Sequence, residues 1–115
     1  MNKRKRKKWL KRHNLYVNPK ELWNLDYTIA EFVLPRLRKF KNATNSYPEN
    51  SEIDVFEKWI STIDKMILAF EYLSDEDEWW IGNSKYDYKQ EFKRRQEVIK
   101  EGLELFAKYF SHLWW

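Results

Sequence analysis

The 115-residue chain is long enough for one domain with its own core, and without cysteine it has neither a disulfide framework nor thiol chemistry. Its net charge of +4 hides a division: residues 1–12, MNKRKRKKWLKR, hold eight cations and no anion, and the remainder has 14 Lys and Arg against 18 Asp and Glu. A basic leader on an acidic body favours a polyanionic partner.

Membrane and secretory classes are not expected. The strongly apolar runs, such as 32–34 and 66–70, are far too short to span a bilayer. No apolar stretch follows the basic leader, as a secretory signal would require. We therefore expect a soluble intracellular protein with no membrane partner.

Residues 1–17 are predicted to be a basic N-terminal arm, and residues 18–115 a helical bundle domain. Like charges repel and nothing in residues 1–8 can be buried, so we expect this stretch to be disordered on its own. Residues 9–17 carry the apolar side chains of the arm and are expected to dock on the body.

The first main helix is predicted over residues 18–41. Asn18 is a suitable N-cap, and Pro19 suits the first helical position. Two apolar stripes run along this segment, which indicates a helix covered on more than one side and predicts that it is the central one. Pro35 lies within the pattern, so we expect a kink or a break there.

Two more helices follow after polar loops. Ser51 is predicted to cap the second helix, which should end near Leu73 or Ser74. The third is expected from about Asp87 to the C-terminus. Gly102 lies in its middle, where it costs about 1 kcal/mol relative to Ala and allows close helix packing.

The predicted fold class is therefore all-α: a bundle of three main helices with a short basic N-terminal arm. Glycine and proline are scarce, and no strand-like alternation of useful length occurs. The helical stripes give the expected core as Leu22, Leu25, Ile29, Val33, Leu37, Ile60, Ile63, Ile67, Phe70, Ile99, Leu103 and Phe106.

Three stretches carry a resemblance to a known family. LWNLDYTIAEFVLPRLRKFK (22–41), DKMILAFEYL (64–73) and RRQEVIKEGLELFAKYFSHLW (94–114) resemble small proteins encoded by tailed bacteriophages and prophages. The resemblance implies a phage origin and an all-helical fold, and hence the cytoplasm of an infected bacterial host. It implies no activity and no catalytic residue.

Cations define the main candidate site. Each Lys or Arg that neutralises a phosphate releases a counterion, and an indole such as Trp9 can stack on a base. The alternatives are a solubilising tail, or an arm folded onto acidic residues 75–78. The predicted nucleic-acid or nucleotide contacts are Lys3, Arg4, Lys5, Arg6, Lys7, Lys8, Trp9, Lys11, Arg12, Arg36, Arg38, Lys39, Lys93, Arg94 and Arg95.

Aromatic pairs are the second candidate feature. Consecutive helical residues point about 100° apart, so neither pair can easily place both rings in one core. We expect one ring of each pair at an interface or as a stacking platform, with core packing as the alternative. The pairs are Trp79 with Trp80 and Trp114 with Trp115.

Catalysis is not expected. No Glu lies three residues before His13 or His112, which excludes a ferritin-like di-iron site. There is no cysteine nucleophile and no glycine-rich phosphate loop, and we expect neither a metal nor a cofactor. Asp26, among apolar residues, is predicted to form a partly buried ion pair with an arginine: Arg36, Arg94 or Arg95. The alternative is a polar group that lines a ligand cleft with Trp23 and Tyr27.

The expected function is that of a non-catalytic phage accessory protein for host takeover or anti-defence, binding a nucleic acid or nucleotide stoichiometrically. Two alternatives remain open. One is an oligomeric sponge that sequesters a nucleotide immune signal. The other is a protein–protein inhibitor of a host defence nuclease, using acidic residues 75–78 as a phosphate mimic. A host protein and a second copy of the chain are thus further candidate partners.

Overall fold

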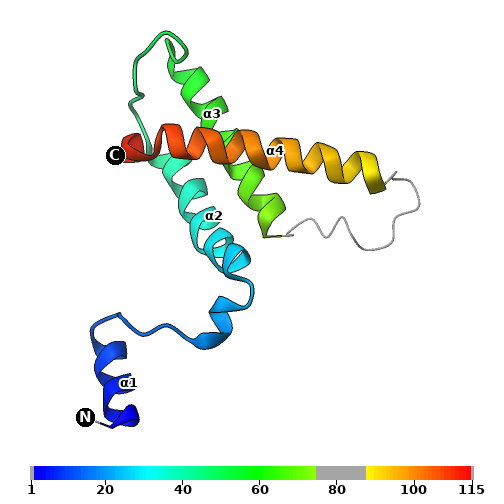
Figure 1. Ribbon diagram of the computed structural model, residues 1–115. Coiled ribbons are helices and arrows are strands. Elements are labelled where there is room, and N and C mark those ends of the chain that lie inside the picture. Colours follow the sequence, from blue (N-terminus) through cyan, green and yellow to red (C-terminus); the bar gives the residue numbers. More distant parts are fainter. Residues whose placement is uncertain (1, 75–87, 115) are drawn as a thin grey trace.

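The computed structural model describes residues 2–74 and 88–114, and in these ranges the chain is helical with no strand (Figure 1). The predicted all-α class is confirmed. Two short 3-10 turns accompany four α-helices. In chain order the elements are α1 (Lys3–Arg12), η1 (Pro19–Leu22), α2 (Leu25–Ala43), α3 (Phe56–Leu73), α4 (Tyr88–Lys108) and η2 (Phe110–His112).

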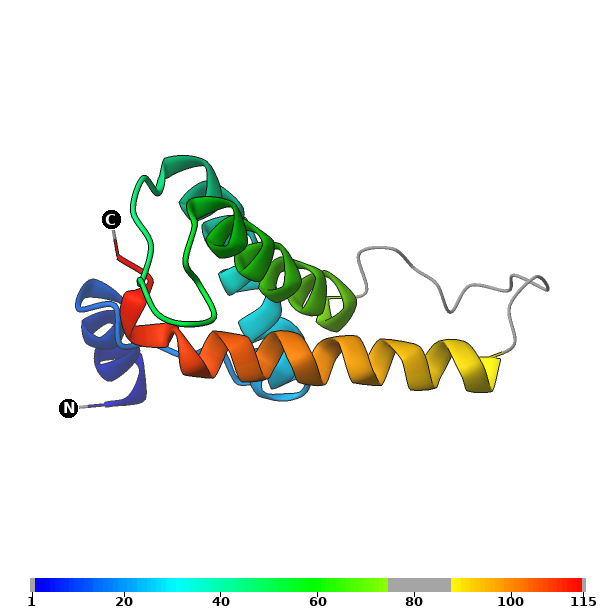
Figure 2. The same cartoon turned by 90° about the horizontal axis from the view of Figure 1, so that it is seen from above.

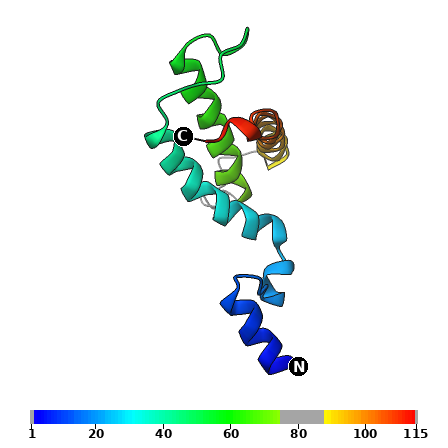
Figure 3. The same ribbon diagram turned by 90° about the vertical axis from the view of Figure 1, so that its left-hand side faces the viewer.

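Helix α3 lies at the centre of the body. Helices α2 and α4 both pack against it, and Figure 3 shows α3 between α2 and the end-on α4. No Cα atom of α2 comes within 8 Å of one of α4. The expectation that the first main helix is central is therefore wrong, and the closed three-helix bundle is not confirmed, because one of its three helix contacts is missing.

The core is built on α3, which contributes six buried residues. Trp59 packs edge-to-face on Tyr109 with ring centroids 5.5 Å apart, and Phe70 packs likewise on Phe106 at 5.1 Å. The buried apolar side chains are Ala30, Leu34, Leu37, Ile53, Trp59, Ile63, Met66, Ile67, Ala69, Phe70 and Tyr109.

The predicted core is right for α3 and wrong for half of α2. Four of its members are buried (Leu37, Ile63, Ile67 and Phe70). Four others are half-buried (Val33, Ile60, Ile99 and Phe106). The remaining four are exposed (Leu22, Leu25, Ile29 and Leu103). For Leu25 and Ile29 the reason is rotation: α2 turns Ala30, Leu34 and Leu37 toward α3, which leaves its other apolar stripe facing outward.

Gly102 lies at a close approach between α3 and α4, which cross in the view of Figure 1 and lie one above the other in the view of Figure 2. A methyl group at position 102 would lie 2.3 Å from Cβ of Ala69 and 2.7 Å from the carbonyl oxygen of Lys65. The prediction that this glycine permits close packing is confirmed.

The start of α2 differs from the prediction. The Asn18 side chain accepts a hydrogen bond from the Lys20 amide at 3.0 Å, but it caps only the turn η1, and α2 begins at Leu25. The helix then continues through Pro35 to Ala43 without a break.

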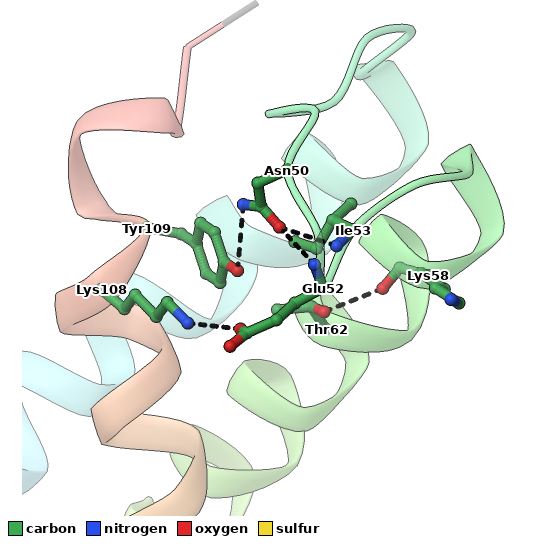
Figure 4. A network of polar contacts seen from close by, with 7 residues as sticks. All are labelled: Asn50, Glu52, Ile53, Lys58, Thr62, Lys108 and Tyr109. Atoms are coloured by element: carbon green, nitrogen blue, oxygen red, sulfur yellow. Dashed lines mark hydrogen bonds and ion pairs between the residues drawn. The ribbon is translucent and has the colours of Figure 1, made fainter.

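The other two helices also have different bounds. Asn50, not Ser51, organises the turn before α3, since its Oδ1 accepts from the Glu52 and Ile53 amides at 2.8 Å each (Figure 4). This turn delays α3 to Phe56, while its predicted end at Leu73 is confirmed. Helix α4 ends at Lys108 because Tyr109 turns inward against Trp59.

Candidate nucleic-acid interface

Helix α1 is defined by local hydrogen bonds at both ends. At its start, Oδ1 of Asn2 accepts from the Lys5 amide at 2.8 Å. At its end, Asn14 adopts a left-handed conformation with φ 57°, and the Leu15 amide donates to the Leu10 carbonyl at 2.8 Å. The Asn14 amide donates to Lys11, which completes a Schellman motif. For residues 2–8, the expectation of disorder is therefore wrong, because two asparagines cap the helix to which they belong.

The positive charges of α1 destabilise it as a helix. Like charges recur four residues apart, as in Arg4 and Lys8 or Lys7 and Lys11, and each such pair destabilises a helix slightly. Three cations, Lys3 to Lys5, also occupy the first turn, where the helix dipole disfavours them. Bound anions would relieve both effects.

The eight cations of α1 stand clear of the body. In the described part of the chain, α1 has no buried residue, contacts no other helix and forms no ion pair (Figure 1). Residues 9–17 were expected to dock on the body; of these, residues 9–12 lie in α1 and make no contact with another helix. The alternative of an arm folded onto acidic residues 75–78 lies outside the described residues and stays a prediction.

Two aromatic side chains of the arm already have partners. The indole of Trp9 stacks on the His13 ring with centroids 4.2 Å apart, and it is 42% exposed. The Tyr16 ring lies under the ammonium groups of Lys7 and Lys11, 5.1 and 5.2 Å from its centroid. One face of Trp9 is thus occupied within the arm, and a base would have to compete for it or use the other.

The basic cluster at the end of α2 divides into engaged and outward-facing cations. Arg38 pairs with Glu71 at 3.0 Å. Arg36 lies over the Phe32 ring at 3.6 Å and donates to the Phe32 carbonyl at 2.7 Å, without an ion pair in the described chain. Lys39 is exposed beside it. Two of the three predicted residues therefore face solvent with their charge uncompensated within residues 2–74 and 88–114.

The cluster at residues 93–95 acts mainly as a clamp between α3 and α4. Arg94 pairs with Glu91 at 2.8 Å and donates to the Tyr72 hydroxyl at 2.9 Å, and these two hydrogen bonds raise its pKa. Arg95 is only 3% exposed, with its guanidinium 3.8 Å from the centre of the Tyr72 ring. Of the three, Lys93 is the one that points into solvent without such a contact in the described chain.

Trp114 lies beside the outward cations of α2. It is 69% exposed and lines a shallow pocket of about 350 Å³ together with Arg36, Lys39 and Phe40. The high aromatic content of the sequence suggested exposed rings, but it did not predict that Trp114 would lie beside the cations of α2. Residues 75–78, Trp79, Trp80 and Trp115 lie outside the described residues, so the predictions for them stay predictions.

Asp26 does not form the predicted ion pair. It is exposed in the first turn of α2, where a negative charge complements the helix dipole. The error follows from the rotation of α2, which carries Asp26 away from α3 and the arginines of α4.

Other site classes find no support in the described ranges. No group of three or more acidic or histidine residues there could hold a metal ion. Within the same ranges, no helix combines the length and apolar character needed to cross a bilayer.

The chain matches no family model, no curated protein and no solved structure. Function must therefore be inferred from the geometry of the residues themselves.

Proposed function

We propose that this protein is a non-catalytic accessory protein of phage origin, acting in the cytoplasm of an infected bacterium, that binds a nucleic acid through α1. The observation that carries the proposal is the set of eight helical cations with no anionic partner in the described chain. Phosphates would supply the missing countercharge, and counterion release would supply most of the affinity.

The shape of α1 favours a double helix as the partner. Ten helical residues form a rod about 15 Å long, and the major groove of B-DNA, about 12 Å wide, admits an α-helix. A single strand would depend more on aromatic stacking, and Trp9 is already stacked on His13. The helix Lys3–Arg12 contains no Asn or Gln to read adenine, so any base preference would come from its three arginines, whose side chains can pair with guanine.

The test replaces the eight α1 cations by Gln and measures affinity for duplex DNA over a salt series. The native chain should lose affinity with a log–log slope of about −0.9 per phosphate contacted, or roughly −5 for six contacts, and the variant should bind weakly with a flat slope. Two exposed lysines outside α1 that are not among the predicted contacts, Lys20 and Lys100, changed to Gln, serve as the control and should leave the slope nearly unchanged. Equal affinity of the native chain and the eight-fold variant at low salt would reject the proposal.

A nucleotide is the second candidate ligand, favoured by the pocket at Arg36, Lys39 and Trp114. Two cations beside an exposed indole suit a phosphate and a base. The discriminating measurement is the ratio of absorbance at 260 and 280 nm of the purified protein, with mass spectrometry of what heating releases. Loss of the released nucleotide in an Arg36→Gln, Lys39→Gln variant would place it here, whereas protein free of nucleotide would remove this candidate.

A further inference from the structure

The outward stripe of α2 is an apolar surface that the described chain leaves uncovered. Leu25, Ile29 and Phe32 are spaced four and three residues apart, so they share one side of the helix. Their side chains are 48, 49 and 60% exposed. Leu22, in the preceding turn η1, is exposed as well. Contiguous exposed apolar side chains of this size mark an interaction surface.

Charges along the same helix are separated by sign. Its first half carries Asp26 and Glu31, both exposed and without an ion pair in the described chain. Its second half carries four cations and no anion, and Arg36 and Lys39 likewise lack an ion pair within the described residues. The helix is therefore acidic at one end and basic at the other, which is complementary to a reversed copy of itself.

The second half of the stripe opens into a groove. The backbones of α2 and α4 stay apart, with no Cα atom of one within 8 Å of the other, and a space of about 250 Å³ remains between the two helices. Phe32, Val33 and Phe40 line it from α2, Phe106 lines it from α4, and Leu113 closes one side. Apart from Arg36 the lining is apolar, so the groove suits projecting aliphatic side chains such as those at the first half of α2.

We propose that two copies of this chain pair through α2 in an antiparallel, two-fold symmetric dimer centred near Phe32. In this arrangement Asp26 of each copy lies opposite Arg36 of the other, and Leu25 and Ile29 of each enter the groove of the other. A parallel pairing would instead bring like charges together. Two-fold homodimers use the same patch on both subunits, as this self-complementary helix allows.

The dimer does not depend on the nucleic-acid proposal, because it uses none of the α1 cations. It does bear on the second candidate ligand, since Arg36 cannot serve both a partner's Asp26 and a nucleotide phosphate at full strength. Whether the chain is a monomer or a dimer therefore tests the proposed dimer and also bears on the nucleotide candidate.

The first experiment is sedimentation equilibrium of the full chain up to about 100 µM, with Ile29→Asp as the test variant. We expect a dimer for the native chain and a dimer dissociation constant raised more than about 100-fold by the buried charge. Phe92, 56% exposed on α4, provides the matched control: Phe92→Asp should leave the association unchanged. Unchanged far-ultraviolet circular dichroism checks that both variants are folded. A native chain that is monomeric throughout, or a dimer indifferent to Ile29→Asp, overturns the proposal.

Charge reversal tests the antiparallel register. Asp26→Lys and Arg36→Glu should each weaken the dimer about tenfold, because each turns two symmetry-related attractions into repulsions. The double variant should recover association, since the ammonium introduced at position 26 of one copy then faces the carboxylate introduced at position 36 of the other. Failure of the double variant to recover any affinity contradicts the proposed pairing.

Cross-linking provides a test that is independent of affinity. The chain has no cysteine, so a single introduced thiol has no competitor. Phe32→Cys, near the proposed two-fold axis, should give a disulfide-linked dimer on mild oxidation, whereas Glu57→Cys, on the exposed first turn of α3, should not. Cross-linking at position 57 but not at 32 would place the interface elsewhere and refute the inference.

Discussion

Helices α1 and α3 are stabilised in opposite ways. Helix α3 has six buried residues and contacts both α2 and α4, while α1 has none and contacts no other helix. What defines α1 is a capping asparagine at each end, working against the repulsion among its cations. The body therefore depends on packing and the arm on local hydrogen bonds and ionic surroundings, so each can be perturbed without the other.

The largest expected effect is on the free energy of unfolding, and it distinguishes a tryptophan in the body from one in the arm. Trp59→Ala should lower the free energy of unfolding by about 3–5 kcal/mol, because Trp59 is 1% exposed and packs on Tyr109. Trp9→Ala, in the arm, should change it by less than about 0.5 kcal/mol. Denaturant unfolding followed by circular dichroism at 222 nm measures both. Equal losses would mean that the arm belongs to the cooperative body.

The next effect concerns the crossing of α3 and α4. Gly102→Ala gains about 1 kcal/mol of helix propensity but forces the new methyl group into Ala69 and the Lys65 carbonyl, so we expect a net loss of about 1–3 kcal/mol. Adding Ala69→Gly to this variant should recover only part of the lost stability, because the Lys65 carbonyl remains in place. Full recovery would show that the side chain of Ala69 is the whole obstacle.

A smaller effect is expected in the arm alone. Asn14→Ala places an alanine at φ 57°, which costs about 1–2 kcal/mol and should fray the end of α1. Asn14→Gly should not fray it, since glycine adopts this conformation freely. Amide hydrogen exchange of residues 10–15 reports the fraying, and the melting temperature of the body should stay constant. A shift in that temperature would contradict the independence of arm and body.

The smallest effect is a pH dependence at the turn before α3. Lys108 lowers the pKa of Glu52 below its usual 4.5, so the pair contributes stability above about pH 4.5 and loses it as the pH falls through the lowered value (Figure 4). Glu52 in turn raises the pKa of Lys108, so this stability is also lost at strongly alkaline pH. Glu52→Gln should match the native chain at acidic pH and fall slightly below it near neutrality, as thermal unfolding over a pH series would measure. Both groups are exposed, and a large difference would require another role for Glu52.

Much of the body could be predicted from the sequence because α3 has a single dominant apolar stripe. Its end at Leu73 and its buried Ile63, Ile67 and Phe70 follow from helical spacing alone. The packing role of Gly102 could be predicted too, because a glycine within a strong helix needs a close neighbour to justify its cost.

The buried side of α2, the helix in the arm and the position of Trp114 could not be predicted, because the sequence patterns there allow more than one structure. Helix α2 has two apolar stripes, and only contact with α3 selects the side of Ala30 and Leu34. In the arm, the run of positive charges predicted disorder. The asparagines at positions 2 and 14, which cap α1 as a helix, are a weaker signal in the sequence. The meeting of Trp114 with Arg36 and Lys39 depends on where the chain turns after α4, which no local pattern specifies.

The contact at Gly102 also bears on how such chains can diverge. At this contact a Cβ atom on residue 102 would meet the side chain of Ala69 and the carbonyl oxygen of Lys65, so a larger residue is costly unless the helices shift or position 69 changes too. A relative that keeps this crossing is therefore expected to favour glycine at that place, even where many surrounding side chains have been exchanged.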